Sequence, residues 1–521
     1  CMLRRPPRST LFPYTTLFRS DPGLPRVGCY GGAPFAPPRL DRLAAEGVRF
    51  ERAYSMPICG PSRAALLTGK YPFRTGAVDN NTSTVDPQRH PTIPLLLRKA
   101  GYATCAIGKL GQSAPEGDIQ APARLGFDEF MLWMGRGTPD RYWNPRYHRH
   151  DGLFQGRPDQ YGPDVTHEFL VDFMQRHRDR PFFVYYSAVL THFPFTRTPD
   201  SRDDAHHVQD MVAYLDKSMG RLADDLDRLG LRDNTLLLFT SDNGPQGEPL
   251  GTVRGRPMVG AKGDVGEGGV RTPLIVNGPG RVPGGRVCPD LADFTDLLPT
   301  VLDLAGVPVP ADLGADGRSL APQILGRPGS PREWVHAQHG RNFFIADHRW
   351  KLYGDGRLVD ISDSPVAETP AVKDDPDAAA ARTRLAAAMA ALRGTARAAP
   401  AVGAVPLKAE VPDGAGAQAA RLRTDLGVLQ QRGIVADTDA WLAAAKAGDG
   451  FDGGQVAALI VRAAATLKPA DDLAGALGIL EAEGVVRGTA YWRQNARAGG
   501  ACSRANVARL VNKIAQRLER R

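Results

Sequence analysis

Residues 59–63, Cys-Gly-Pro-Ser-Arg, place a nucleophilic side chain where a helix is expected to begin. Pro61 suits a first helical turn, where its missing N–H is not needed, and Gly69 can end a short helix. The free N–H groups and the dipole at such a helix start favour an oxyanion beside Cys59. The alternative is a buried Cys before an ordinary helix, but the Ser and Arg that follow add donors to the same turn. The segment therefore predicts an enzyme that acts on an anion.

Polar residues also follow several apolar runs that are predicted as strands. The predicted strands are Ala103–Ile107, Phe182–Tyr186, Leu236–Phe239 and Leu274–Val276. Lys109 follows the first of them and His192 the second, and Asp242 and Asn243 come directly after the third. Ligands of open α/β sheets gather outside the carboxyl ends of the strands. We therefore expect these side chains to share one pocket with Cys59.

The alternation of these runs with helical stretches predicts an α/β fold, a sheet sandwiched by helices. The helical stretches are 94–100, 166–177, 208–229 and 294–305. A smaller α+β unit is expected at 333–394, with strands at Trp350–Tyr353 and Leu358–Asp360.

The carboxyl-terminal part has a different character. Residues 395–420 are rich in Ala, Pro and Gly and are typical of a linker. Beyond it, pairs such as Trp441 and Trp492, or Leu459 and Leu510, keep one constant offset. The repeat predicts two copies of a small all-α unit at 421–521, in which the Trp residues serve as core anchors or, alternatively, stack on a ligand.

Composition narrows the class of protein. The chain has 521 residues, 42% hydrophobic and 23% charged, and lacks a run of about 18 apolar residues that could span a membrane. The net charge of +8 is spread along the chain, which argues against a nucleic-acid partner. The six Cys have no Cys-x-x-Cys spacing, which argues against a zinc knuckle or a dense disulfide scaffold.

Residues 59–63 resemble the signature of the type I sulfatases, in which the Cys of Cys-x-Pro-Ser-Arg is converted to formylglycine. The flanking residues continue the resemblance: Gly31-Gly32, 40–44 (LDRLA) and 47–50 (GVRF) before the motif, and 67–72 (LTGKYP) after it. Similarity extends to about Ile361. It implies an alkaline-phosphatase-like fold, hydrolysis of a sulfate monoester (aryl or carbohydrate), and a catalytic domain at 21–332.

The resemblance also implies roles for single residues. Arg63 would orient the hydrate of formylglycine 59, and Lys109 and Lys262 would hold sulfate oxygens. His192 would protonate the leaving alcohol; the alternative is a surface or capping His, but its position after a strand and before Phe-Pro favours the functional role. The metal shell would consist of Asp21, Cys59, Asp242 and Asn243, whose oxygens suit Ca²⁺ or Mg²⁺. Glu267 and Arg271 are expected to brace the loop after Lys262 by pairing.

The amino terminus departs from this pattern. Residues 10–20, TLFPYTTLFRS, are what a common sequencing adapter gives when translated, so we interpret 1–20 as artefactual sequence; a divergent natural terminus is the alternative. The alignment places Ser20 and Asp21 on the paired metal Asp residues of the family. We therefore expect one metal carboxylate and the central strand to be missing. Residues 1–19 say nothing about a signal peptide.

A second departure follows Lys109. Relatives read Gly-Lys-Trp-His or Gly-Lys-Trp-Gln there, whereas this chain has Leu110 and, two residues on, Gln112. The histidine that assists the formylglycine hydrate is absent, and Gln112 cannot act as a base near neutral pH. Two alternatives to a sulfatase stay open. One is a phosphate or phosphonate monoester hydrolase of the same superfamily, because relatives with the same Cys motif and fold do that chemistry, and the other is an impaired homologue that only binds.

The expected partners follow from the same resemblance. They are a sulfated small molecule or carbohydrate and the enzyme that forms formylglycine. We expect no nucleic-acid partner and no membrane span, and the residues of the repeats do not indicate a particular ligand. The resemblance implies a periplasmic or secreted protein. Aromatic and cationic residues at 136–150, with Arg197, could line a sugar-binding cleft or pack a loop against the sheet.

Overall fold

The computed structural model describes residues 14–19, 24–33, 37–110, 118–133, 141–192, 195–202, 207–245, 249–365, 367–372 and 374–394, and in addition 451–452, 501–502 and 510. The chain forms two compact units, 1–400 and 401–521. Most of the second unit lies outside the described residues, as do the predicted linker at 395–420 and the two Trp residues of the repeat. Those described include two short paired strands, β20 (Phe451–Asp452) and β21 (Ala501–Cys502), so the expectation of an all-α module is wrong for these four residues.

The first unit is built on a mixed sheet of eleven strands. In spatial order β12, β3, β13, β9, β1, β8, β4, β5, β6 and β7 lie side by side, and β14 also pairs with β3. Their bounds are β1 Tyr14–Arg19, β3 Val48–Tyr54, β4 Ala103–Gly108, β5 Glu129–Leu132, β6 Arg146–Arg149, β7 Gly152–Gln155, β8 Phe182–Ala188, β9 Leu236–Ser241, β12 Arg271–Thr272, β13 Leu274–Asn277 and β14 Arg286–Asp293. The four strands predicted from the sequence are β4, β8, β9 and β13, and the structure confirms all four.

The central strand is present, which corrects the expectation that it is missing. Tyr14–Arg19 lies between β8 and β9 and is parallel to both, with Arg19 in register with Ala188 and Ser241. Four of its six residues are Tyr, Thr or Phe, which are enriched in strands, so the composition of this segment favours a strand. That residues 1–20 derive from an adapter stays a prediction.

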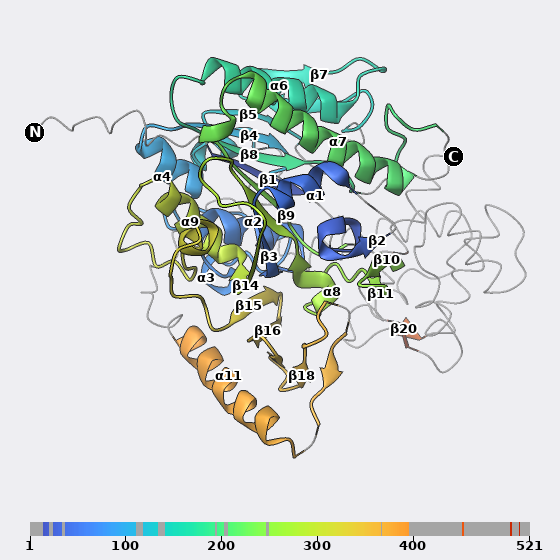
Figure 1. The fold of residues 1–521 in the computed structure, drawn as a ribbon, viewed down its shortest axis with the longest axis vertical. Coiled ribbons are helices and arrows are strands. Elements are labelled where there is room, and N and C mark those ends of the chain that lie inside the picture. Colours follow the sequence, from blue (N-terminus) through green and yellow to red (C-terminus); the bar gives the residue numbers. More distant parts are fainter. Residues whose placement is uncertain are drawn as a thin grey trace, which may run out of the picture. The chain divides into compact units, whose positions relative to one another are not determined.

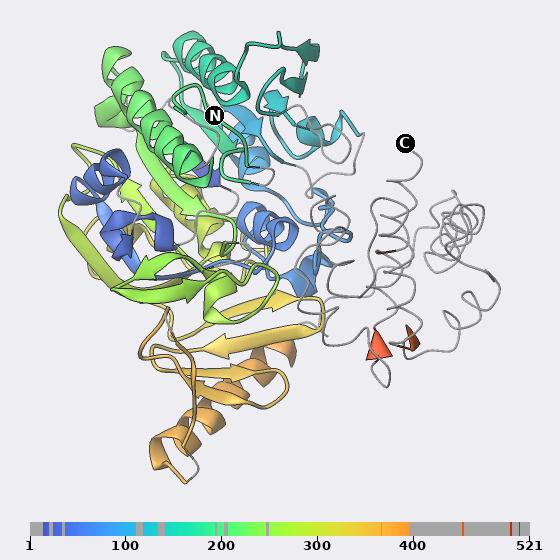
Figure 2. The ribbon, with the colours of Figure 1, turned by 90° about the vertical axis from the view of Figure 1, so that its right-hand side faces the viewer.

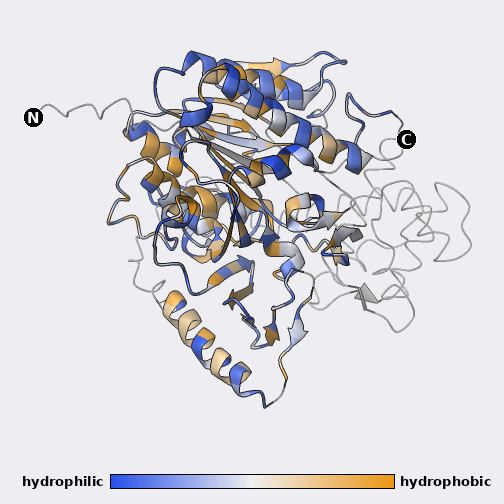
Figure 3. Ribbon diagram, viewed as in Figure 1, coloured by the Kyte–Doolittle hydropathy of each residue, from blue (hydrophilic) through white to orange (hydrophobic). Residues whose placement is uncertain are grey.

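Helices cover both faces of this sheet (Figure 1). One face carries α1 (Pro38–Ala45), α6 (Gly162–Arg176) and α7 (His207–Arg228), and the other carries α2 (Cys59–Thr68), α4 (Ile93–Lys99) and α9 (Leu297–Leu304). Alternate strand residues serve the two faces: Phe183 and Tyr185 pack in one cluster, and Phe182, Val184 and Tyr186 in the other. Figure 3 shows apolar residues gathered along the central strands and on the helix faces turned to them.

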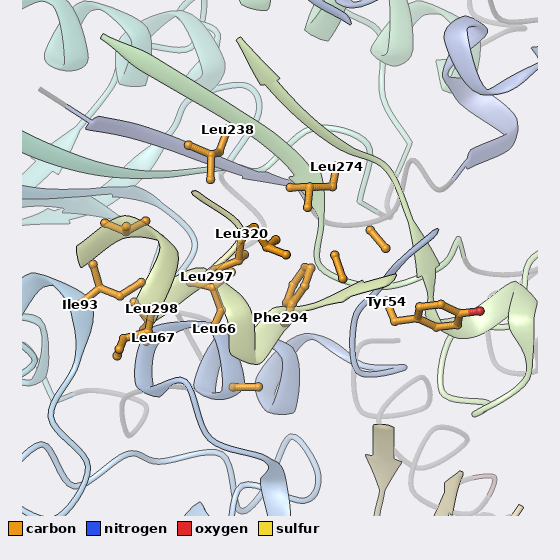
Figure 4. Close-up of a cluster of buried hydrophobic side chains, with 14 of the residues drawn as sticks. Tyr54, Leu66, Leu67, Ile93, Leu238, Leu274, Phe294, Leu297, Leu298 and Leu320 are labelled. Atoms are coloured by element: carbon orange, nitrogen blue, oxygen red, sulfur yellow. The ribbon is translucent and has the colours of Figure 1, made fainter. Parts of the chain in front are cut away.

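Helix α2 is buried along its whole length, including its polar residues. Leu66 and Leu67 lie beside Leu297 and Leu298 of α9 (Figure 4). Gly69 ends the helix in the left-handed conformation, with φ of 66°, as the sequence predicts. Because α2 is packed on every side, the position of Cys59 at its amino terminus is rigid.

A second sheet follows, built from five antiparallel strands in sequence order (Figure 2). They are β15 Val335–His339, β16 Asn342–Ala346, β17 Trp350–Tyr353, β18 Leu358–Asp360 and β19 Thr369–Pro370, and helix α11 (Pro376–Gly394) packs on them through Ala381 and Leu385. We call β15–β19 the small sheet. A three-stranded sheet of β2 (Gly32–Ala33), β10 (Pro249–Val253) and β11 (Arg256–Val259) precedes the loop that carries Lys262.

Among the described residues, the other helices are short: α3 Pro72–Thr75, α5 Ala121–Arg124, α8 Glu267–Val270 and α10 Ala321–Ile324. The 3₁₀ segments are Leu24–Arg26, Gly28–Tyr30, Arg232–Asn234 and Phe294–Asp296. No helix in this part of the chain combines the length and the apolar character that a membrane span requires.

Candidate active site

Cys59 is the first residue of α2 and is 2% exposed. Its Sγ lies 3.4 Å from Lys109 Nζ and 3.4 Å from Asn243 Oδ1. These neighbours come from the ends of β4 and β9, so the strand-end rule brings the predicted residues together. The side chain of Asn80 accepts a hydrogen bond from the free N–H of Gly60, at 2.9 Å.

Arg63 lies one helical turn after Cys59 and is 1% exposed. Its Nη2 donates to Asp242 Oδ2 at 2.6 Å, and its Nη1 donates to Tyr185 Oη at 2.8 Å, to the carbonyl of Lys109 at 2.5 Å and to Ser187 Oγ. Burial alone would lower the pKa of Arg63, but the nearby Tyr185 and Asp242 raise it. Arg63 therefore remains a cation that fixes three strand ends around Cys59.

Lys109 is buried and carries its ammonium beside Cys59. Burial lowers the pKa of Lys109, and the charges of Arg63 and Lys262 lower it further, against the opposing effects of Cys59 and Asp242. The turn that aims Lys109 requires Gly108, because a Cβ there would lie 1.9 Å from the carbonyl oxygen of Ser187 and φ is +87°. Lys109 and Lys262 thus supply positive charge to one place.

Lys262 is half-buried in the loop between β11 and α8. Its N–H donates to the carbonyl of Pro245 at 3.1 Å, and the next N–H, of Gly263, donates to the carbonyl of Pro57 at 2.8 Å. Pro245 lies two residues after Asn243, and Pro57 lies two residues before Cys59, so both bonds tie the loop to segments that carry site residues. The charge of Lys262 is one of those that lower the pKa of Lys109.

His192 lies four residues beyond the end of β8. Arg141 Nη2 is 3.1 Å from His192 Nδ1, and Tyr142 Oη donates to the backbone carbonyl of His192 at 2.6 Å. Because a guanidinium only donates, Nδ1 is the acceptor of this contact. His192 is therefore oriented by the 141–142 segment.

Asp242 and Asn243 are both fully buried directly after β9. Asp242 Oδ1 has no hydrogen-bond partner among the described residues, and Asn243 Oδ1 faces Cys59 Sγ. A buried, unpaired carboxylate oxygen beside an amide oxygen fits a hard divalent cation. Within the described ranges, no group of three or more His, Cys, Asp or Glu side chains is arranged to hold a metal ion. Asp21, the other predicted ligand, lies outside these ranges, as does Gln112.

Sequence reasoning missed several residues of the site. Tyr185 and Ser187 both contact Arg63, and they are hydroxyl-bearing residues at alternate positions near the end of a buried strand, which is a readable signal. The segment 136–150 and Arg197, by contrast, were singled out from the sequence. Trp143 Nε1 donates to the backbone carbonyl of Arg197 at 2.9 Å, with the guanidinium 5.3 Å from its ring. This pair therefore packs two loops together.

A strand-end site with a Cys at a buried helix start, two lysines and an Asp-Asn pair is the site of an α/β enzyme that handles an oxyanion. Comparison with known proteins agrees. Residues 18–307 match the model of the sulfatase family, and this chain belongs to that family. It is 34% identical over 349 residues to canine (Canis lupus familiaris) N-acetylgalactosamine-6-sulfatase, covering 60% of this chain and 65% of that protein.

Two further relatives add to the comparison. Human arylsulfatase A is 34% identical over 371 residues, which cover 63% of this chain and 70% of that protein. The crystal structure of Ps i-CgsB in complex with k-i-k-neocarrahexaose superposes with a TM-score of 0.64 at 25% identity, covering 73% of this chain and 92% of that one. The predicted family and the alkaline-phosphatase-like α/β fold are thereby confirmed.

Proposed function

We propose that this protein hydrolyses a sulfate monoester through a formylglycine derived from Cys59. The observation that carries the proposal is the environment of Cys59 Sγ, with Lys109 Nζ and Asn243 Oδ1 each 3.4 Å away in a buried pocket. The sulfur stands where the oxygens of the modified side chain would lie. Membership of the sulfatase family supports the same chemistry.

Formylglycine supplies an aldehyde hydrate, whose one hydroxyl can take the sulfuryl group and whose second can release it by carbon–oxygen cleavage. The residues of this chain do the rest. Lys109 and Lys262 hold the sulfate oxygens and offset the charge that grows in the transition state. Arg63 orients the nucleophile and pairs with Asp242, which lies beside it. His192 faces the leaving oxygen and protonates it.

A divalent cation, Ca²⁺ or Mg²⁺, would be held by Asp242, Asn243 and the modified side chain of Cys59, with Asp21 as a further ligand. When bound, it supplies positive charge to the nucleophile and the sulfate. Asp242 Oδ1 is the described atom that fits it most directly, because this oxygen is buried without a hydrogen-bond partner in the described part of the chain. Arg63 occupies only the other oxygen.

A sulfated carbohydrate or an aryl sulfate is the proposed substrate class. One solved relative is in complex with a neocarrahexaose, and the chain spans 65% of the length of the N-acetylgalactosamine-6-sulfatase it resembles. By the same family resemblance we propose that the protein is periplasmic or secreted and is matured by a formylglycine-forming enzyme. We also propose the domain division at 332 and the repeat module at 421–521.

The test compares three esters with one leaving group: an aryl sulfate, the matching aryl phosphate and the matching phosphonate monoester. The proposal predicts that the sulfate is hydrolysed with the highest kcat/KM, and that Cys59→Ala abolishes turnover of all three. Turnover of phosphate or phosphonate alone would make the chain a phosphohydrolase of the same superfamily. Binding of the esters without turnover, by protein whose Cys59 is modified, would make it a binding homologue.

A further inference from the structure

The loop 260–270 carries Lys262. On one side it is held by the segments that follow β3 and β9 of the eleven-stranded sheet, through the carbonyls of Pro57 and Pro245. On its other side it meets the small sheet. His339, the last residue of β15, has its Nδ1 2.7 Å from the carbonyl oxygen of Gly263. A carbonyl only accepts, so Nδ1 carries the proton and donates to the residue next to Lys262.

A second contact holds the other end of the loop. Lys351 of β17 is 0% exposed, and its Nζ lies 3.0 Å from Glu267 Oε1 and 2.9 Å from Glu368 Oε1. The N–H of Glu267 donates to Glu368 Oε1 at 2.7 Å, so the same carboxylate holds both the loop backbone and the lysine. Glu267 Oε2 accepts hydrogen bonds from Tyr54 Oη, at 3.2 Å, and from Ser364 Oγ.

Glu267 is the carboxylate at the centre of this cluster. Burial alone would raise the pKa of Glu267, but Lys351 and Arg271 outweigh it and hold the pKa at about 2. A buried ion pair stabilises a fold no better than well-packed apolar side chains of the same size would. Its contribution here is to positioning, because the contacts of Lys351 and Glu368 fix the location of α8 and of the end of the Lys262 loop.

We propose that the small sheet positions Lys262, with His339 holding one end of its loop and Lys351 the other. His339 and Lys351 are positioning residues that set where the ammonium of Lys262 stands relative to Cys59. The role of Lys262 itself rests on the proposed function. A displacement of about 1 Å at such a group can lower activity about 100-fold.

The experiment uses a matched pair at one half-exposed position. His339→Leu removes the donor to Gly263, whereas His339→Asn keeps an N–H close to the place of Nδ1. We expect His339→Leu to lower kcat/KM about 10- to 100-fold, mostly through a higher KM, and His339→Asn to restore most of it. Arg349→Ala is the control. It breaks an exposed ion pair with Asp360 of the small sheet, and its kcat/KM should match that of the wild type.

Two further readouts separate positioning from general damage. In a Lys262→Ala background, His339→Leu should cost little more, because there is no ammonium left to position. Amide hydrogen exchange of 260–270 should speed up in His339→Leu while that of β9 stays unchanged. Two results would overturn the inference. One is a His339→Leu variant with the activity of the wild type, and the other is a loss of activity on His339→Leu that is as large in the Lys262→Ala background as in the wild type. If the wild type hydrolyses no sulfate ester, the proposed function fails, and the exchange of this loop still decides the inference.

Discussion

Arg63 and Asp242 form an ion pair at the centre of the site, with 2.6 Å between Nη2 and Oδ2 and side chains 1% and 0% exposed. Breaking such a pair leaves one charge buried without a partner. We predict that Arg63→Met lowers the free energy of unfolding by about 3–5 kcal/mol, measured by denaturant titration. Arg42→Met is the control: it breaks an exposed pair with Glu46 and should leave the free energy of unfolding close to that of the wild type. Equal losses would contradict the buried arrangement.

Lys109 differs from Arg63 in that its charge is expected to serve activity and not stability. Because burial lowers its pKa, its charged form is held at a cost to the fold, whereas the charge next to Cys59 serves the reaction. We predict that Lys109→Met lowers kcat/KM for a sulfate ester by about 10²–10³-fold and leaves the free energy of unfolding equal or higher. Lys99→Met, on the exposed end of α4, should change neither quantity. A large loss of stability with Lys109→Met would count against this role.

How much the sequence predicted depends on whether a residue acts through its own strand or through contact with a distant segment. Lys109, Asp242 and Asn243 were predictable because each directly follows an apolar run, and parallel strands bring such ends together. Cys59 was predictable from Pro61 and the donors of its helix start.

Contacts across distant segments were not predictable in this way. His339 lies 76 residues from Gly263, and Lys351 lies 84 residues from Glu267, so no local period or spacing links them. The bracing of Glu267 by Arg271 was expected, but Lys351 and Glu368 come from the small sheet and its flank. The central strand shows a further limit: Tyr14–Arg19 differs from the apolar strand expected there, yet it pairs in parallel with both β8 and β9.

His336 predicts how stability depends on pH. It packs against Tyr71, with ring centroids 4.9 Å apart, and burial, with the charges of Arg393 and Arg332, lowers its pKa to about 3. Below pH about 6.5 the unfolded chain therefore binds a proton at His336 that the folded chain does not bind. The free energy of unfolding is consequently highest above that pH and decreases as the pH falls below it. We predict that His336→Phe removes up to about 1.4 kcal/mol per pH unit of this loss, measured by unfolding between pH 7 and pH 4. Parallel curves for the two proteins would refute the prediction.

The amino terminus yields a prediction about metal affinity. If Ser20 stands where the family has its first metal Asp, Ser20→Asp should tighten Ca²⁺ binding in calorimetry, and Asp242→Asn should weaken it. Both effects are measured without reference to turnover. A chelator should lower the melting temperature of Ser20→Asp more than that of the unchanged chain, because a tighter ligand stabilises the folded state more. No difference in Ca²⁺ affinity between the two proteins would refute the alignment of Ser20.

The most direct test of the central claim is the mass of the tryptic peptide 53–63, which contains Cys59 as its single Cys. The protein is produced with and without a formylglycine-forming enzyme in the same host. The account predicts an aldehyde, or its hydrate, in place of the thiol when the maturing enzyme is present, and an unmodified Cys when it is not. An unmodified thiol in both preparations would contradict a formylglycine-dependent sulfatase.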